Sequence, residues 1–151
     1  MIGNCKNVLV LAPHTDDGEL GLGGTINKLI TEGKRVTYVA FSTAEESVPP
    51  GFPKDILKTE VRNATAKLGI KSENLIIYSY QVRKLNYVRQ EILEELIKIL
   101  EDYVNIDMEE KWAYELAKLY DIAGEGEKCV NMCDEISLWF AEGKYVVKAM
   151  D

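Results

Sequence analysis

Residues 7–25 read NVLVLAPHTDDGELGLGGT and join a short apolar run to a polar, glycine-rich turn. The run from Val8 to Leu11 is typical of a strand buried on both faces, and Pro13 is expected to end it. Apolar residues between Leu20 and Ile30 then recur at helical spacing, and Gly33 supplies a helix stop. The polar turn therefore follows the carboxyl end of a strand, the position at which open α/β sheets bind ligands.

The residues that follow repeat this alternation of strand and helix. Two segments rich in β-branched and aromatic residues are predicted strands, Arg35–Phe41 and Leu75–Tyr78. Two segments with apolar residues at helical spacing are predicted helices, Lys54–Leu68 and Tyr87–Tyr103. The segment Ser42–Pro53 contains three prolines and a glycine, so we expect a loop there. This order predicts an α/β fold, a three-layer structure in which a parallel, Rossmann-like sheet has helices on both faces.

The alternation stops after Asn105, where helical sequence begins. Met108–Ala123 and Glu127–Phe140 both have helical patterns and are separated by two glycines. The charge changes at the same place, because residues 1–104 hold 14 acidic and 13 basic side chains whereas residues 105–151 hold 11 and 5. We therefore predict an incomplete α/β domain over residues 1–104 and an acidic helical hairpin over residues 105–151.

The composition excludes several classes of protein. The net charge of −7 disfavours a nucleic-acid binder, which needs a basic face. No apolar run approaches the ~20 residues that a membrane-spanning helix requires. Three cysteines, an odd number, and an N-terminus without the features of a secretory signal favour the cytoplasm. The single histidine excludes any site in which this chain supplies two or three imidazoles.

The polar turn contains side chains that suit metal-dependent chemistry. His14 and Asp17 are of metal-ligand types and can converge on one ion where a loop turns into a helix. Asp16 lies between them and can take a proton from water that the ion activates. The same residues also suit a helix N-terminus, which an Asp can cap and where glycines allow a tight turn. The residues alone leave both interpretations open.

The whole string resembles the LmbE-like family, which includes the PIG-L N-acetylglucosaminyl-phosphatidylinositol de-N-acetylases. The family pattern after the first strand is H-P-D-D-x-E-x-G-x-G-G-T, and His14 to Thr25 follow it in register with Thr15 in place of the proline. The resemblance covers about the first hundred residues of the chain. Further matching positions are Gly33–Thr37, Glu60, Leu68–Ile70, Arg83 and Arg89–Leu93.

The resemblance implies a hydrolase that acts on linear amides. By that resemblance, His14 and Asp17 would bind a catalytic Zn²⁺ and Asp16 would be the general base. The expected function is that of a zinc-dependent N-deacetylase whose substrate is an N-acetylated amino sugar or a similar small molecule.

The sequence departs from the family pattern after residue 100. In the family, a fourth strand leads to an H-x-x-H segment, whose last histidine completes the zinc site and whose first stabilises the oxyanion. This sequence has neither the fourth strand nor the two histidines. With two protein ligands, we expect weak zinc binding. An oxyanion donor typically lowers the activation barrier by ~3 kcal/mol, so its loss predicts less than the full activity of the family. A third ligand could come from Asp102, from Asp107 or from another subunit. Cys129 and Cys133 are four residues apart on one helix face and are of metal-ligand type, but their pattern is more typical of small buried residues on an amphipathic helix.

The acidic tail supports a second hypothesis. Its two helices resemble a tetratricopeptide-type pair over one repeat, with small and apolar residues at matching offsets: Ala113, Leu116, Ala117, Tyr120, Cys129, Cys133 and Ile136. One repeat cannot bury its apolar face alone, so its aromatic residues are expected to pack on the α/β part or on a protein partner: Trp112, Trp139, Phe140 and Tyr145. The chain would then be a non-catalytic scaffold or interaction module, or a fusion of two unrelated pieces.

Overall fold

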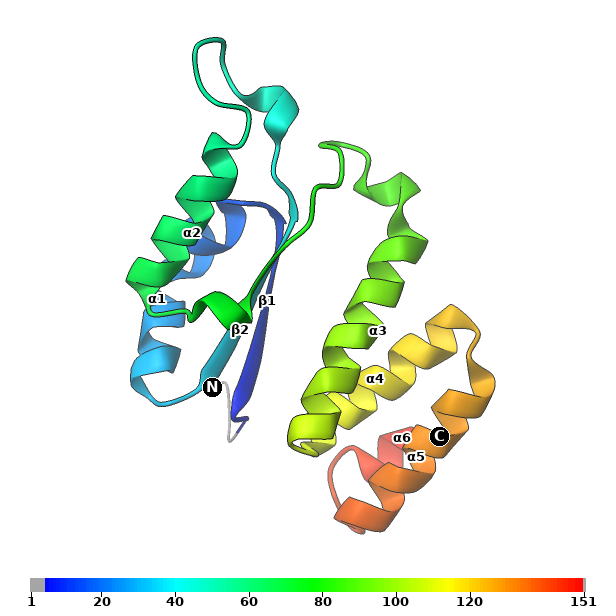
Figure 1. The fold of residues 1–151 in the computed structure, drawn as a ribbon. Coiled ribbons are helices and arrows are strands. Elements are labelled where there is room, and N and C mark those ends of the chain that lie inside the picture. The colour runs from blue at the N-terminus through cyan, green and yellow to red at the C-terminus, as the bar shows by residue number, and fades with distance from the viewer. Residues whose placement is uncertain (1–4, 151) are drawn as a thin grey trace. The chain divides into compact units, whose positions relative to one another are not determined.

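The computed structural model describes residues 5–150. The chain divides between Val88 and Arg89 into two compact units. The first is an α/β unit and the second is helical (Figure 1). The division comes before helix α3 (Arg89–Ile106), because α3 packs against the next helix of the second unit. The join expected near Asn105 from the change in pattern lies inside that helix.

The first unit contains three parallel strands in the order β1-β2-β3. Its elements are β1 (Asn7–His14), α1 (Asp17–Thr31), β2 (Arg35–Ser42), α2 (Ile56–Leu68) and β3 (Leu75–Ile77), with 3-10 turns at Glu45–Ser47, Ser72–Asn74 and Leu85–Tyr87. The register of the first pair runs from Asn7 opposite Arg35 to His14 opposite Ser42. The α/β class and the parallel sheet predicted from the sequence are confirmed.

Helices α1 and α2 cover the same face of this sheet (Figure 1). Two successive right-handed crossovers in one direction put both helices on one side, which explains the arrangement. The core between helices and sheet consists of Val10, Ala12, Ile26, Leu29, Val36, Tyr38, Ala40, Val61 and Ile70. Within the first unit, therefore, one of the two helical layers expected from the sequence is present, and α3 belongs to the second unit.

Strand β1 continues through Pro13 to His14, although Pro13 was expected to end it. In the described part of the chain, β1 is an edge strand of the sheet. An edge strand has hydrogen-bonding groups on its outer side that pair with no other strand, so a proline there does not interrupt the hydrogen bonds between strands. Helix α1 begins at Asp17, three residues before the start predicted from the apolar spacing. The connection from strand to helix is thus only Thr15 and Asp16, which places His14 close to Asp17.

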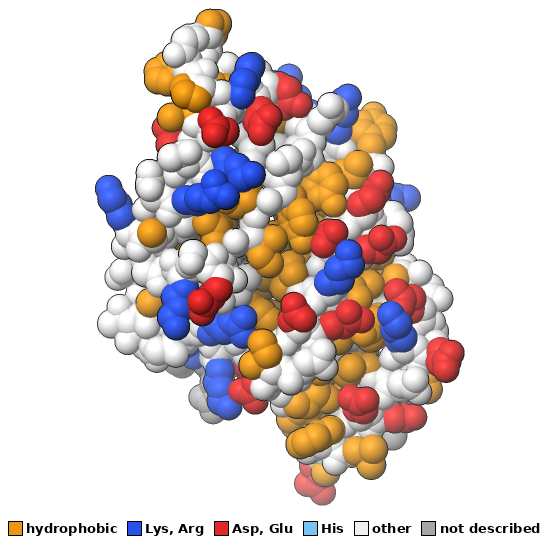
Figure 2. Space-filling view, in the orientation of Figure 1, with side chains coloured by type: hydrophobic (Ala, Val, Ile, Leu, Met, Phe, Trp, Pro, Cys, Tyr) orange, Lys and Arg blue, Asp and Glu red, His pale blue; other side chains and the backbone are white. Residues whose placement is uncertain are grey.

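The second unit contains α3, α4 (Glu110–Ala123), α5 (Gly126–Phe140) and the short α6 (Val146–Met150). Its core includes Ala113, Ala117, Ile136 and Val146, and the half-buried Cys129 and Cys133 pack against it. The unit holds 16 acidic and 7 basic residues, against 9 and 11 in the first unit. Figure 2 shows acidic side chains outnumbering basic ones on the visible face of these helices. No helix between residues 5 and 150 is long and apolar enough to cross a bilayer.

Aromatic side chains of the acidic tail pack within the helical unit itself, which corrects part of the expectation. Trp112 contacts Tyr103 of α3 edge to face at 5.5 Å between ring centroids, and Tyr145 lies 5.2 Å from Tyr114. Trp139 remains 70% exposed. Helices α3 and α6 supply packing surface that a single helix pair lacks, so α4 and α5 do not stand alone. The tetratricopeptide resemblance stays a prediction.

Replacing Ile136 by Ala should strongly destabilise the helical unit. Ile136 is 0% exposed in the core that α4, α5 and α6 share, and such truncations cost about 2–5 kcal/mol through lost burial and the cavity left behind. Leu138→Ala is the matched control two residues away, because Leu138 is 84% exposed and should change stability by less than about 0.5 kcal/mol. Urea unfolding followed by far-UV circular dichroism measures both, and equal small effects would contradict the packing of α5.

Candidate functional site

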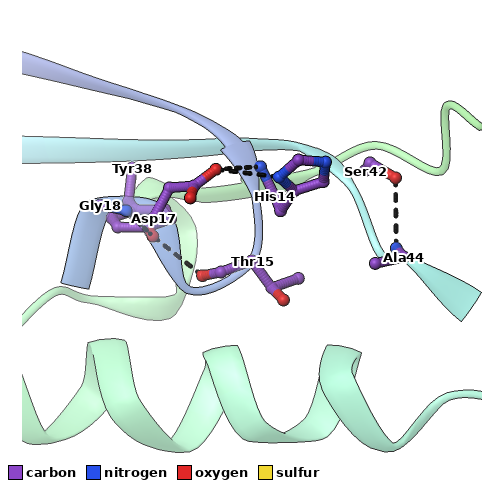
Figure 3. A network of polar contacts seen from close by, with 7 residues as sticks. All are labelled: His14, Thr15, Asp17, Gly18, Tyr38, Ser42 and Ala44. Carbon is purple, nitrogen blue, oxygen red and sulfur yellow. Dashed lines mark hydrogen bonds and ion pairs between the residues drawn. The ribbon is translucent and has the colours of Figure 1, made fainter. Parts of the chain in front are cut away.

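The turn between β1 and α1 brings His14 and Asp17 into direct contact (Figure 3). The backbone N–H of His14 donates a hydrogen bond to Oδ2 of Asp17 at 2.9 Å. The same Oδ2 lies 3.1 Å from Nδ1 of the His14 imidazole. The side chains are 36% and 46% exposed, so solvent and solutes reach both. The two predicted metal ligands therefore lie together at the carboxyl end of β1.

The spacing of these two donor atoms suits a shared metal ion. Zinc ligands at about 2.0–2.2 Å from a tetrahedral ion lie about 3.3 Å from each other, and the Nδ1–Oδ2 distance is 3.1 Å. Among residues 5–150, no three His, Cys, Asp or Glu side chains form a group that could hold a metal. Asp102 lies in α3, and Cys129 and Cys133 lie in α5, all within the helical unit. The described residues thus fit two positions of a zinc coordination sphere.

Asp16 lies beside this pair in a cleft with a volume of about 570 Å³. The volume falls within the range of about 300–1,000 Å³ typical of small-molecule sites. The cleft is lined by His14, Thr15, Asp16, Ala44, Ser47, Leu57, Val82, Arg83, Leu85 and Asn86. Asp16 is exposed, lines the cleft and makes no side-chain capping bond to α1. The capping interpretation of Asp16 therefore finds no support in the geometry.

Two residues of the cleft wall have left-handed backbone conformations. Ala44 follows β2 with a φ of 50°, and Arg83 follows β3 with a φ of 63°. This region is sparsely populated by residues other than glycine and is enriched at ligand sites. Ser42 Oγ accepts a hydrogen bond from the Ala44 N–H at 3.2 Å, which helps to hold the first of these turns. Part of the cleft wall is therefore built from constrained loops after two strands.

Tyr38 of β2 lies beneath the turn and is 0% exposed (Figure 3). Its hydroxyl donates to the carbonyl oxygen of Thr15 at 2.9 Å and accepts from the N–H of Gly18 at 3.1 Å. Burial raises the pKa of the Tyr38 hydroxyl, so it keeps its donor hydrogen at neutral pH. Sequence reasoning missed this residue. The available signal was a tyrosine within an apolar strand, because a buried hydroxyl needs a partner.

Glu19 is the third acidic residue of the turn and faces the protein. Its Oε2 is buried and has no hydrogen-bond partner among the described residues. Burial raises the pKa of Glu19, and the nearby carboxylates of Asp16 and Glu60 raise it further. The environment of Glu19 thus favours its neutral form.

Residues 9–108 match one known protein family, PIG-L, which is described as GlcNAc-PI de-N-acetylase. The match covers about two thirds of the sequence and includes the whole turn from His14 to Asp17. The chain belongs to the PIG-L family. The resemblance predicted from the His14 to Thr25 motif is confirmed for this part of the protein.

Two solved structures share the fold of this PIG-L family member. One is N,N'-diacetylchitobiose deacetylase from Pyrococcus horikoshii, complexed with its inhibitor MPG, which is 30% identical to this chain with a TM-score of 0.59. The match covers 66% of this chain and 38% of that deacetylase. The conserved protein TT1542 from Thermus thermophilus is 26% identical to this chain, with a TM-score of 0.51. The match covers 63% of this chain and 42% of TT1542. The chain therefore spans about two fifths of the length of these structures. No curated protein was found to match it.

Proposed function

We propose that this PIG-L-family chain carries the site of a zinc-dependent N-deacetylase whose substrate is an N-acetylated amino sugar or a similar small molecule. The contact between His14 and Asp17, beside Asp16 in a cleft at the carboxyl end of β1, is the observation that carries the proposal. The structural likeness to a deacetylase of an N-acetylated disaccharide supports the substrate class.

The three motif residues have separate roles in this proposal. His14 through Nδ1 and Asp17 through Oδ2 would hold the zinc ion. When bound, zinc polarises a carbonyl group and brings the pKa of a water molecule toward neutrality. Asp16 accepts the proton of the attacking water on its carboxylate and returns it to the departing amine.

The rest of the cleft would bind and orient the sugar. Leu57, Val82 and Leu85 offer apolar surface for a sugar face, whereas Ser47 and Asn86 offer hydrogen bonds to hydroxyl groups. A cleft of about 570 Å³ has the size of a small-molecule site. The size and lining of the cleft therefore support a small polar substrate.

Purified protein should bind zinc weakly. Two protein ligands leave most of the coordination sphere to water, so we expect less than one zinc ion per chain and easy removal by a mild chelator. His14→Ala and Asp17→Ala should each abolish the residual binding. The double substitution Cys129→Ser and Cys133→Ser is the control and should leave it unchanged. Metal analysis that finds tight, equimolar zinc in the wild type would contradict the two-ligand site.

A further inference from the structure

We propose that Tyr38 is a positioning residue whose buried hydroxyl holds the turn between β1 and α1, so that His14 and Asp17 meet at the distance a shared metal ion requires. The inference rests on the proposed function for its metal, and the contact between His14 and Asp17 is the geometry that it explains. Tyr38 lies on β2, whereas His14 ends β1 and Asp17 begins α1, and it comes 24 residues after His14 in the sequence.

The hydroxyl group bridges the two ends of the turn (Figure 3). It donates to the carbonyl oxygen of Thr15, the residue after His14, and accepts from the N–H of Gly18, the residue after Asp17. One buried atom therefore ties together the backbone on either side of Asp16. The two bonds restrain the backbone that carries the Asp17 carboxylate toward His14.

The start of α1 explains why this bond is needed. The first N–H groups of a helix have no partner within the helix, and Gly18 is the second residue of α1. The helical ladder begins with the N–H of Leu20, which donates to the carbonyl oxygen of Asp16 at 3.0 Å. Since Asp16 makes no capping bond, the Tyr38 hydroxyl satisfies the buried N–H of Gly18 in its place.

The absence of a side chain at Gly18 fits the same arrangement. A Cβ atom there would lie 2.6 Å from Cε2 and 2.7 Å from the hydroxyl oxygen of Tyr38. The backbone of α1 can approach the ring this closely only because residue 18 is a glycine. The tyrosine and the glycine therefore form one complementary contact under the site.

The first test uses the metal-free protein and the variant Tyr38→Phe, which keeps the ring and removes the hydroxyl. Thr65→Val is the matched control, because Thr65 is 1% exposed and its hydroxyl also donates to a backbone carbonyl, that of Val61 at 2.6 Å. Amide hydrogen exchange followed by NMR should show faster exchange at Gly18 and His14 in Tyr38→Phe and unchanged rates at both in Thr65→Val. The His14 N–H reports the contact with Asp17 directly.

The second test measures Co²⁺ as a spectroscopic probe of the same site. Substitutions of groups that orient metal ligands typically lower metal affinity about 10- to 100-fold. We expect a loss of that size, with a weakened Co²⁺ absorption band, in Tyr38→Phe and wild-type affinity in Thr65→Val.

The outcomes separate this inference from the proposed function. Unchanged exchange at His14 in Tyr38→Phe would overturn the positioning role, whatever the metal does. Absence of Co²⁺ binding in the wild type would overturn the proposed metal site, while the exchange rates would still decide the role of Tyr38. If Tyr38→Phe folds poorly, amide exchange in the wild type tests the inference instead. Fast exchange of the Gly18 N–H would contradict its hydrogen bond to the Tyr38 hydroxyl.

Discussion

Replacing Asp16 by Asn should abolish release of acetate from an N-acetylated glucosamine while leaving the fold intact. General-base catalysis typically contributes about 10²- to 10⁴-fold to the rate, and an amide side chain cannot accept the proton. Asp16 is exposed and caps nothing, so its loss should not change stability. The measurement is the rate at which free amine appears, at equal zinc content in both proteins.

The control for this substitution is Asp55→Asn. Asp55 is also exposed, also precedes a helix, and also makes no side-chain capping bond, but it does not line the cleft. It should leave the turnover unchanged. Turnover that survives in Asp16→Asn would exclude Asp16 as the base. A wild type without any turnover would instead favour the alternative of a non-catalytic scaffold.

Replacing Gly18 by Ala should destabilise the α/β unit, although alanine normally favours a helix. The added Cβ would lie within 2.8 Å of three atoms of the Tyr38 side chain, and Tyr38 is 0% exposed and cannot move aside without repacking the core. Overpacking of this kind typically costs about 1–3 kcal/mol. Thermal unfolding measures the loss of stability, and zinc binding should fall with it because the turn is displaced.

Gly21→Ala in the same helix is the matched control. No atom outside its own helix lies within 4 Å of the Cβ that this substitution adds. It should therefore show only the gain of helix propensity, about 0.5–1 kcal/mol of added stability. If both alanine variants stabilise the protein, the close contact between Gly18 and Tyr38 is not present in solution.

Local patterns in the sequence predicted most of the first unit. Apolar runs and helical spacing found its strands and helices, and the motif located His14, Asp16 and Asp17 because adjacent residues in a short turn must lie close together. The strand boundary at Pro13 was wrong, since the cost of a proline depends on whether its strand is at an edge. That property is set by the sheet and not by the local sequence.

Features made by distant parts of the chain were not predicted. Tyr38 reaches the turn from another strand, and the cleft wall comes from loops after β2 and β3 with strained Ala44 and Arg83. Likewise, the periodicity of α3 resembles that of the earlier helices. Its packing against α4, which sets the boundary between the units, depends on which apolar faces meet in three dimensions.

X-ray absorption spectroscopy of the zinc-loaded protein tests the proposed site most directly. Because the chain contains one histidine, the spectrum should show nitrogen and oxygen ligands at about 2.0–2.2 Å and the outer scattering of a single imidazole. That imidazole signal should disappear in His14→Ala. A sulfur shell at about 2.3 Å would instead place the metal on cysteine and contradict a site formed by His14 and Asp17.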